Sequence, residues 1–167
     1  MSEVYVAAGS NVDPERHLRI AAKEIARVFP GARFSGAYRN AAVGFEGEDF
    51  INFVVGFSTE LPVEAVVAEL QRIEGLCGRT RDAPKWAPRS MDLDILVFGD
   101  RVCDLPGLVL PRPDLLKRPY MLGPMAELAP DFLHPTRLSA MAQLWENFDR
   151  AAHSMVRVEI GLDSATE

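Results

Sequence analysis

The sequence contains few cysteines and no long hydrophobic run. Its 167 residues include only 2 cysteines, Cys77 and Cys103, and these form no CxxC pair. We therefore expect reduced thiols in a cytoplasmic protein, with no disulfide. No apolar stretch approaches the length of about 18 residues that a membrane helix needs, and the N-terminus has no basic region followed by an apolar run. We expect neither a signal peptide nor a membrane span.

The sequence also lacks several common ligand-binding signatures. It has no GxxxxGK[ST] loop, so a nucleotide would have to be held by side chains and a metal ion. The formal net charge is −6, which makes extended duplex nucleic acid an unfavourable partner. The three histidines, His17, His134 and His153, are scattered and fit no metal-binding spacing. No residue stands out as a general base.

The pattern of apolar residues predicts an α+β domain. Hydrophobic residues make up 48% of the chain and charged residues 25%, which is typical of a globular domain. β-forming segments and stripes of helical period alternate in the order β-α-β-β-α-β, the split arrangement of a ferredoxin-like sandwich. We expect both helices on one face of a mostly antiparallel sheet. The predicted strands are 3–9, 32–40, 50–60 and 93–100, and the predicted helices begin at Asp13-Pro14 and at Pro62.

The C-terminal part differs in character. Residues 105–130 hold many prolines, which predicts loop and short helices. Residues 136–148 have the pattern of a helix, and 155–160 could add a strand at the edge of the sheet. We expect one domain over 1–167, with a core at about 3–135 and a C-terminal extension beyond it.

Asp92 and Asp94 lie at the start of the last predicted core strand. Residues i and i+2 of a strand point to the same face, so these carboxylates would project side by side, about 7 Å apart. Like charges at this spacing favour a cation between them, and Mg²⁺ prefers oxygen ligands from carboxylates, phosphates and water. The alternative is a solvated strand end with surface ion pairs, the commoner case for an isolated DxD.

Basic residues gather just upstream in this acidic chain: Arg72, Arg79, Arg81, Lys85 and Arg89. Arginine suits bidentate contact with phosphate, and metal ligands beside arginines are what polyphosphate chemistry requires. The alternative is a charged face exposed to solvent. Trp86 lies among these cations, where it either anchors the segment or covers a flat ligand.

Residues 85–95, KWAPRSMDLDI, closely resemble the signature R-W-G-P-R-[ST]-x-D-[LI]-D-[IL] of the 6-hydroxymethyl-7,8-dihydropterin pyrophosphokinase family. Other segments resemble further family motifs, and the resemblance spans about residues 3–135. The family has a ferredoxin-like fold, in agreement with the order of elements given above. These segments are AAGSN (7–11), YRNAAVG (38–44), DFIN (49–52) and LPRPDLLKRPYMLGPMAELAP (110–130).

The resemblance implies a transferase of folate biosynthesis, a kinase that moves the β,γ-pyrophosphoryl group of ATP to the hydroxymethyl group of the dihydropterin and releases AMP. It implies two Mg²⁺ ions held by Asp92 and Asp94, with Arg79 and Arg89 acting beside them on the phosphates. Arg81 and Trp86 match the family's mobile loop. The positions implied for ATP binding are Gln71, Glu74, Arg79, Arg81, Arg89, Ile95, Arg112 and Arg118.

A pterin ring needs an amide to read its edge and aromatic groups on its faces. Asn52 fits the first need, although an amide that caps a turn is the simpler explanation without the resemblance. Tyr120 matches the family's stacking residue, whereas Phe50 could instead belong to the core. The positions implied for pterin binding are Asn40, Val43, Phe50, Asn52, Trp86, Asp92 and Tyr120.

The chain departs from the family pattern at several positions. Arg112 stands where the family usually has His, and Lys85 and Ala87 replace the usual Arg and Gly around Trp86. We expect activity to survive, as a monomer that binds ATP and the pterin but neither nucleic acid nor membrane. Two other functions remain possible: another Mg²⁺-dependent enzyme that uses nucleotides, and a nucleotide-sensing ferredoxin-like module.

Overall fold

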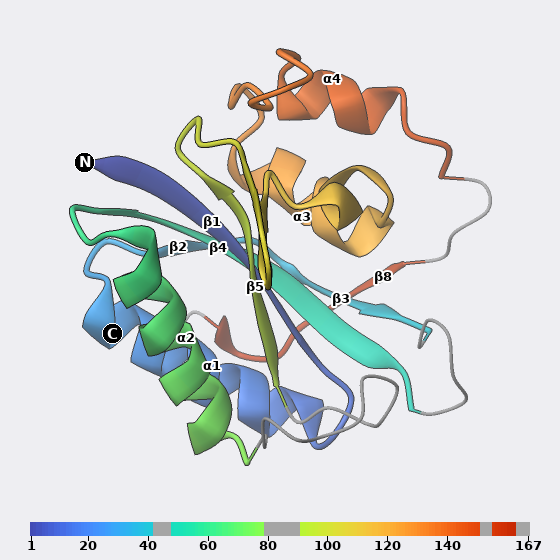
Figure 1. Cartoon of the computed structure of the whole chain (residues 1–167). Coiled ribbons are helices and arrows are strands. Elements are labelled where there is room, and N and C mark those ends of the chain that lie inside the picture. The colour runs from blue at the N-terminus through green and yellow to red at the C-terminus, as the bar shows by residue number, and fades with distance from the viewer. Residues whose placement is uncertain (42–47, 79–90, 151–154, 163–167) are drawn as a thin grey trace.

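The computed structural model describes residues 1–41, 48–78, 91–150 and 155–162. Its core follows the predicted β-α-β-β-α-β order, except that the second predicted strand is divided in two (Figure 1). The ferredoxin-like prediction is therefore confirmed. The core elements are β1 (Ser2–Ser10), α1 (Pro14–Val28), β2 (Arg33–Phe34), β3 (Ala37–Asn40), β4 (Phe50–Thr59), α2 (Val63–Leu76) and β5 (Asp92–Phe98).

The main sheet has the strand order β5-β1-β4-β3-β8, in which β8 (Val156–Val158) lies near the C-terminus. All the described strand pairs are antiparallel, and β2 also pairs with β4. The pairing of β8 with β3 confirms the edge strand expected in 155–160. Because β1 lies between β4 and β5, the sheet brings residues from three strands into one row.

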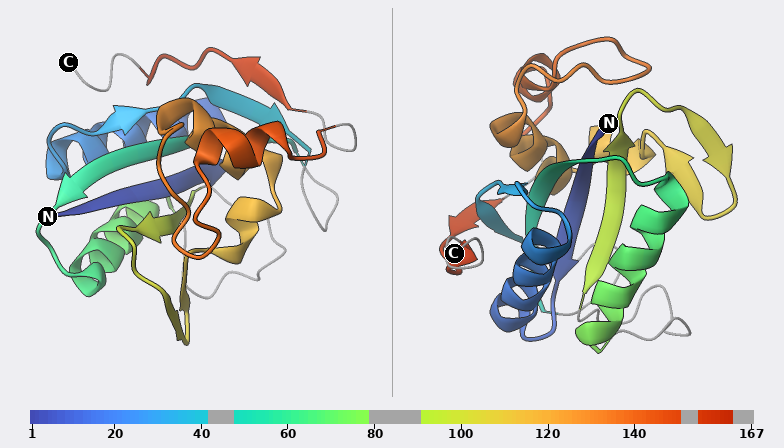
Figure 2. Two further views of the ribbon diagram at one scale, coloured as in Figure 1. Left: turned by 90° about the horizontal axis from the view of Figure 1, so that it is seen from above. Right: turned by 90° about the vertical axis from the view of Figure 1, so that its left-hand side faces the viewer.

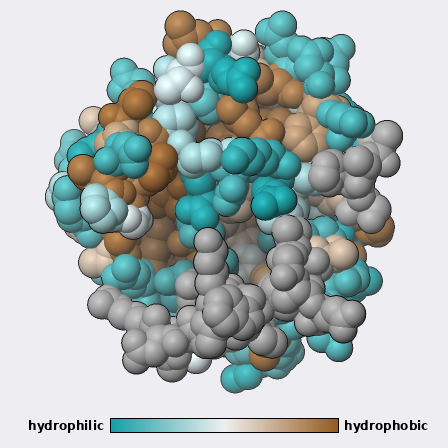
Figure 3. Space-filling model, turned by 45° about the vertical axis from the view of Figure 1, so that its right-hand side comes forward, coloured by the Kyte–Doolittle hydropathy of each residue, from teal (hydrophilic) through white to brown (hydrophobic). Residues whose placement is uncertain are grey.

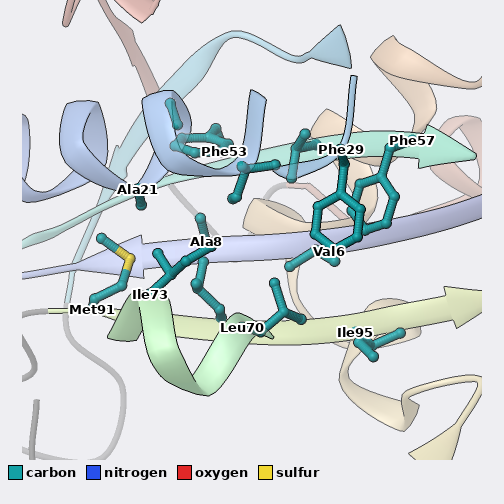
Figure 4. Close-up of a cluster of buried hydrophobic side chains, with 14 of the residues drawn as sticks. Val6, Ala8, Ala21, Phe29, Phe53, Phe57, Leu70, Ile73, Met91 and Ile95 are labelled. Carbon is teal, nitrogen blue, oxygen red and sulfur yellow. The ribbon is translucent and has the colours of Figure 1, made fainter. Parts of the chain in front are cut away.

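Helices α1 and α2 cover one face of the sheet with their apolar stripes (Figure 4). Leu18 and Ile25 of α1, and Leu70 and Ile73 of α2, are buried against the strands. Burial of one such side chain contributes about 1.5–3 kcal/mol relative to exposure, which fixes both helices to the sheet. Asp13 occupies the N-cap position of α1, as expected, but its side chain makes no capping hydrogen bond.

Residues 113–146 cover the opposite face of the sheet with three short helices (Figure 2). These helices are η1 (Pro113–Leu116), α3 (Pro119–Leu128) and α4 (Met141–Glu146). Apolar residues of α3 and α4, such as Met125 and Met141, pack against Tyr5, Val54 and Leu96 of the strands. The short helices expected among the prolines are therefore present. The sequence did not predict that they would bury the second face of the sheet.

The helix predicted over 136–148 is wrong in its first half, because α4 spans only Met141–Glu146. Residues 134–139 form a turn in which the backbone N–H of His134 donates to the Ser139 carbonyl, 3.0 Å away. Leu138 has a φ of 55°, in the left-handed region, which a right-handed helix cannot continue through. The turn thus overrides the helical periodicity of this segment.

Two strand predictions also need correction. The strand expected over 32–40 is interrupted at Ser35, whose backbone N–H and side-chain hydroxyl both bond to the backbone of Val54, each at 2.9 Å. The strand expected over 93–100 ends at Phe98, because Gly99 turns the chain with a φ of 56°. A hairpin of β6 (Cys103–Leu105) and β7 (Leu108–Leu110) follows, which the sequence did not predict.

Both cysteines are free thiols, as expected. Cys77 is buried beyond the end of α2, and this burial raises the pKa of its thiol to about 11. The thiol is therefore unreactive at neutral pH.

As for membrane association, none of the helices in the described ranges has the length and hydrophobicity needed to cross a bilayer.

His134 makes the stability of the fold dependent on pH. The ring is buried, and its Nδ1 accepts hydrogen bonds from the backbone N–H groups of Thr136, at 3.3 Å, and Arg137, at 3.1 Å. Burial, and secondly the charge of Arg137, lower the pKa of His134 below its usual value. The folded state therefore favours the neutral ring, and its stabilising contribution is complete above the unfolded pKa, near 6.5.

We expect the stability due to His134 to be lost as the pH falls below about 6.5 toward the folded pKa, at no more than about 1.4 kcal/mol per pH unit. Thermal unfolding measured from pH 7.5 to 5.0 should show this fall in the wild type. His134→Asn keeps an acceptor but cannot titrate, so its melting temperature should depend less on pH. His17→Asn retains His134 and should behave like the wild type; an equal fall in all three proteins would exclude His134 as the cause.

Candidate functional site

Asp92 and Asp94 lie at the start of β5, on the face of the sheet opposite Leu93 and Ile95. Leu93 and Ile95 are buried in the core beneath α1 and α2, whereas both carboxylates are partly exposed. The alternation expected of a strand is therefore present. It places two negative groups on one face, at a point where solvent and a ligand can reach them.

A pocket of about 280 Å³ surrounds these carboxylates. Because β5 is the edge strand of the sheet, the pocket extends past that edge and takes walls from α2, from β5 and from the β6–β7 hairpin. Its lining residues are Val67, Leu70, Gln71, Glu74, Asp92, Leu93, Asp94, Ile95, Gly107, Leu108, Val109 and Arg112.

The pocket brings together six of the residues expected at the site: Gln71, Glu74, Asp92, Asp94, Ile95 and Arg112. Glu74 also links α2 to β5, since its Oε2 accepts a hydrogen bond of 2.9 Å from the backbone N–H of Leu93. Sequence reasoning missed the apolar wall, formed by Val67, Leu70 and the hairpin residues 107–109. Val67 and Leu70 belong to the apolar stripe of α2, so the sequence placed both on one face of that helix. The proline-rich pattern of residues 105–130 did not predict the hairpin.

Gly9 of β1 lies between one of the two carboxylates and Asn52, a residue predicted to bind the pterin. Its sheet partners are Asp92 on β5 and Asn52 on β4, so the three residues form one row across the sheet. A Cβ atom at Gly9 would lie only 2.5 Å from Oδ1 of Asn52. The absence of a side chain at Gly9 therefore leaves the space that the Asn52 amide occupies.

Asn52 lies within β4 rather than at a turn, which excludes the turn-capping interpretation. It is buried, and its amide Nδ2 donates a hydrogen bond to Oδ1 of Asn40 on the neighbouring strand β3. The Asn40 amide in turn donates to the Ala41 carbonyl, 3.1 Å away. This chain of hydrogen bonds orients the Asn52 side chain, as recognition of a ring edge requires.

Two aromatic side chains lie around this row. Phe50 is half-buried, and its ring is 3.7 Å from the position that a Gly9 Cβ would take. Burial raises the pKa of Tyr120, and the negative charges of Asp114, Asp92 and Asp94 raise it further, while Arg118 opposes them. Tyr120 and Arg118, at the start of α3, therefore lie within electrostatic reach of the carboxylates. The face of the molecule drawn in Figure 3 carries hydrophilic residues in its middle, between more hydrophobic areas.

Five residues expected at the site fall outside the described ranges: Val43, Arg79, Arg81, Trp86 and Arg89. Among the residues that are described, no group of three or more His, Cys, Asp and Glu side chains could hold a metal ion. Two carboxylates on one strand face nevertheless suit Mg²⁺, which commonly takes one or two protein carboxylates and completes its octahedron with phosphate and water oxygens. The donor set fits such an ion when a phosphate ligand is bound with it.

Comparison with known proteins identifies the family to which the chain belongs. The sequence model of the 7,8-dihydro-6-hydroxymethylpterin-pyrophosphokinase (HPPK) family matches residues 5–130. The fold, the paired carboxylates and this match define the chain as a ferredoxin-like domain of the pyrophosphokinase type. It belongs to the 7,8-dihydro-6-hydroxymethylpterin-pyrophosphokinase family.

Individual relatives carry the corresponding name, 2-amino-4-hydroxy-6-hydroxymethyldihydropteridine pyrophosphokinase. The protein from Synechocystis is 36% identical over 150 residues, which cover 88% of this chain and 76% of the relative. The protein from Pseudomonas aeruginosa is 37% identical over 139 residues, covering 81% of this chain and 85% of the relative. The protein from Aquifex aeolicus is 33% identical over 137 residues, covering 81% and 85%.

Solved structures support the fold. An HPPK-DHPS triple mutant from Plasmodium falciparum, crystallised with pteroate, matches with a TM-score of 0.65 at 13% identity and covers 87% of this chain. A further HPPK-DHPS structure, in complex with substrates, matches with a TM-score of 0.68 at 12% identity and covers 90%. This chain spans less than half of those proteins, 43% and 44% of their lengths.

Proposed function

We propose that this chain transfers the β,γ-pyrophosphoryl group of ATP to the hydroxymethyl oxygen of 6-hydroxymethyl-7,8-dihydropterin, giving the pterin diphosphate and AMP in folate biosynthesis. Family membership supports this activity. The observation that carries it is the row of Asp92, Gly9 and Asn52. This row places one of the two carboxylates suited to a metal ion beside an oriented amide. The free thiols are consistent with a cytoplasmic location.

In this proposal Asp92 and Asp94 would hold two Mg²⁺ ions, which would supply positive charge to neutralise the triphosphate and to lower the pKa of the attacking hydroxyl. Arg112 is the one described arginine lining the pocket, and it would contact the phosphates. Arg79 and Arg89 would add further phosphate contacts, while Arg81 and Trp86 would cover the site, as the family motif implies.

The nucleotide base would lie in the apolar part of the pocket. Val67 and Leu70 of α2, Ile95 of β5 and the hairpin residue Leu108 line this space. Apolar side chains on both sides suit a flat aromatic base, and Gln71 and Glu74 provide polar atoms for its edge. We assign this part of the pocket to adenine, with the triphosphate directed toward Asp92 and Asp94.

The pterin would lie on the sheet beyond Asp92. The buried amide of Asn52, oriented by Asn40, would bond to the donors and acceptors at the ring edge. Tyr120 and Phe50 would stack on the ring faces, and Val43 would add an apolar contact. This placement brings the hydroxymethyl group toward Asp92, the residue paired with Gly9 in the same row.

The products of ATP provide the test. Incubation with ATP, Mg²⁺ and 6-hydroxymethyl-7,8-dihydropterin should give AMP and the pterin diphosphate in equal amounts, measured by chromatography. Omission of the pterin should abolish AMP formation. Formation of ADP would indicate a single phosphoryl transfer, release of pyrophosphate would indicate a nucleotidyltransferase, and nucleotide binding without turnover would indicate a sensor. Each of these results would contradict the proposal.

A further inference from the structure

Arg112 reaches into the pocket from the segment between β7 and η1. Its Nη1 lies 3.6 Å from Oδ1 of Asp94, and its Nη2 lies 3.5 Å from Oδ2 of Asp114. Its backbone N–H donates to the carbonyl of Leu96, at 2.8 Å, which fixes this residue beside β5. The guanidinium group therefore stands between two carboxylates, one of which we have assigned to metal binding.

The guanidinium group has capacity for a further ligand. Its Nε atom is buried and finds no hydrogen-bond partner within the described part of the chain. The side chain as a whole is 35% exposed, so the outer part of the group remains within reach of a molecule entering the pocket. A buried donor without a partner is costly, and an anionic ligand that accepted from it would remove that cost.

We propose that Arg112 takes the place of the metal ion at Asp94 while no nucleotide is bound, and moves to the triphosphate when ATP enters with its metal. This inference rests on the proposed function, since it takes Asp94 as a metal ligand. A cation this close to Asp94 repels a second cation, so an Mg²⁺ ion arriving alone must displace the guanidinium group. The triphosphate offers that group a bidentate partner and also completes the coordination of the metal.

The consequence is positive coupling between metal and nucleotide. Each should bind weakly by itself and raise the affinity of the protein for the other by the same factor. Arg112 is thus a positioning residue that weakens the binding of free metal ions at Asp94.

Direct metal binding tests the inference without reference to turnover. Mn²⁺ serves as the probe, and free Mn²⁺ is measured by electron paramagnetic resonance with and without a nonhydrolysable ATP analogue. We expect Arg112→Met to bind Mn²⁺ alone about tenfold more tightly than the wild type, within the range of typical coupling energies. The increase in Mn²⁺ affinity caused by the analogue should be about tenfold smaller in this variant.

Two further variants separate charge from position. Arg112→Lys retains a cation and should keep the weak binding of free Mn²⁺. Arg101→Met removes an exposed arginine outside the pocket and should behave like the wild type, which controls for the change in net charge. Circular dichroism and thermal unfolding establish that each variant is folded.

The outcomes distinguish this inference from the proposed function. Equal affinities of wild type and Arg112→Met for free Mn²⁺, together with tight binding in the presence of the analogue, would overturn the role of Arg112 and leave the proposed function intact. A tenfold gain in Arg101→Met as well would show a general charge effect, and would also overturn it. Absence of Mn²⁺ binding to the wild type even with the analogue would refute the metal site, and with it both proposals.

Discussion

Replacement of Asp92 or Asp94 by asparagine should reduce kcat by at least about 100- to 1,000-fold, the range found when one preorganised electrostatic contact to a transition state is removed. Asparagine keeps the size of the side chain but removes the charge that would hold the metal ion. Both carboxylates are partly exposed at the start of β5, so the substitutions leave the buried core unchanged. Steady-state kinetics with saturating ATP and pterin, together with thermal unfolding, measure the effect.

The turn that follows β5 offers a matched control. Asp100 follows the end of β5, is exposed, and lies away from the pocket. Asp100→Asn makes the same change in charge, and its kcat should remain within about twofold of the wild type, as expected of an exposed substitution with little effect on the fold. Turnover near the wild-type rate in Asp92→Asn and in Asp94→Asn would show that these carboxylates do not hold a metal ion that the reaction needs.

The pair of carboxylates was predictable because it depends only on local geometry. A strand places residues i and i+2 on one face whatever it pairs with, so the sequence alone sets Asp92 beside Asp94 and directs Leu93 into the core. The order of the core elements was predictable for a similar reason. The apolar stripes of α1 and α2 and the β-forming runs between them each mark their own element.

Features that depend on strand register were not predictable. The row of Asp92, Gly9 and Asn52 requires three strands to pair in one register, and no single segment contains that information. The contact of Arg112 with Asp94 likewise depends on how the segment after β7 returns to β5. The resemblance to a family identified these residues, apart from Gly9, as site positions, but it could not state which of them contact one another.

Tertiary interactions also changed local structure. Residues 136–148 have a helical pattern of apolar residues, yet the first half forms a turn held by the buried ring of His134. Residues 105–110 contain a proline and a glycine, which favoured the prediction of a loop. The segment instead forms part of the hairpin that makes one wall of the pocket. In both segments a few specific contacts outweighed weak local preferences.

Substitution of Gly9 by alanine should selectively weaken pterin binding. The new Cβ would lie 2.5 Å from Oδ1 of Asn52, a distance that forces the amide to move. Loss of the oriented amide should cost about 1–3 kcal/mol, which corresponds to a roughly 5- to 150-fold increase in the Kd for the pterin. Affinity for a nonhydrolysable ATP analogue should stay within about twofold, because the part of the pocket that we assign to adenine is formed by α2 and the hairpin. Isothermal titration calorimetry measures both affinities.

A double-mutant cycle shows whether Gly9 acts through Asn52. If it does, Gly9→Ala combined with Asn52→Ala should bind the pterin no more weakly than Asn52→Ala alone, because the amide that the methyl group displaces is already absent. Additive losses would instead mean that the methyl group meets the ligand or disturbs Asp92, the other neighbour of Gly9 in the sheet.

Gly75→Ala in α2 is the control, since a Cβ there meets nothing within 4 Å. That variant should bind the pterin like the wild type and gain about 0.5–1 kcal/mol of stability, as alanine does over glycine in a helix. Selective loss of pterin affinity in Gly9→Ala would therefore locate the pterin on the row of residues that joins β5, β1 and β4.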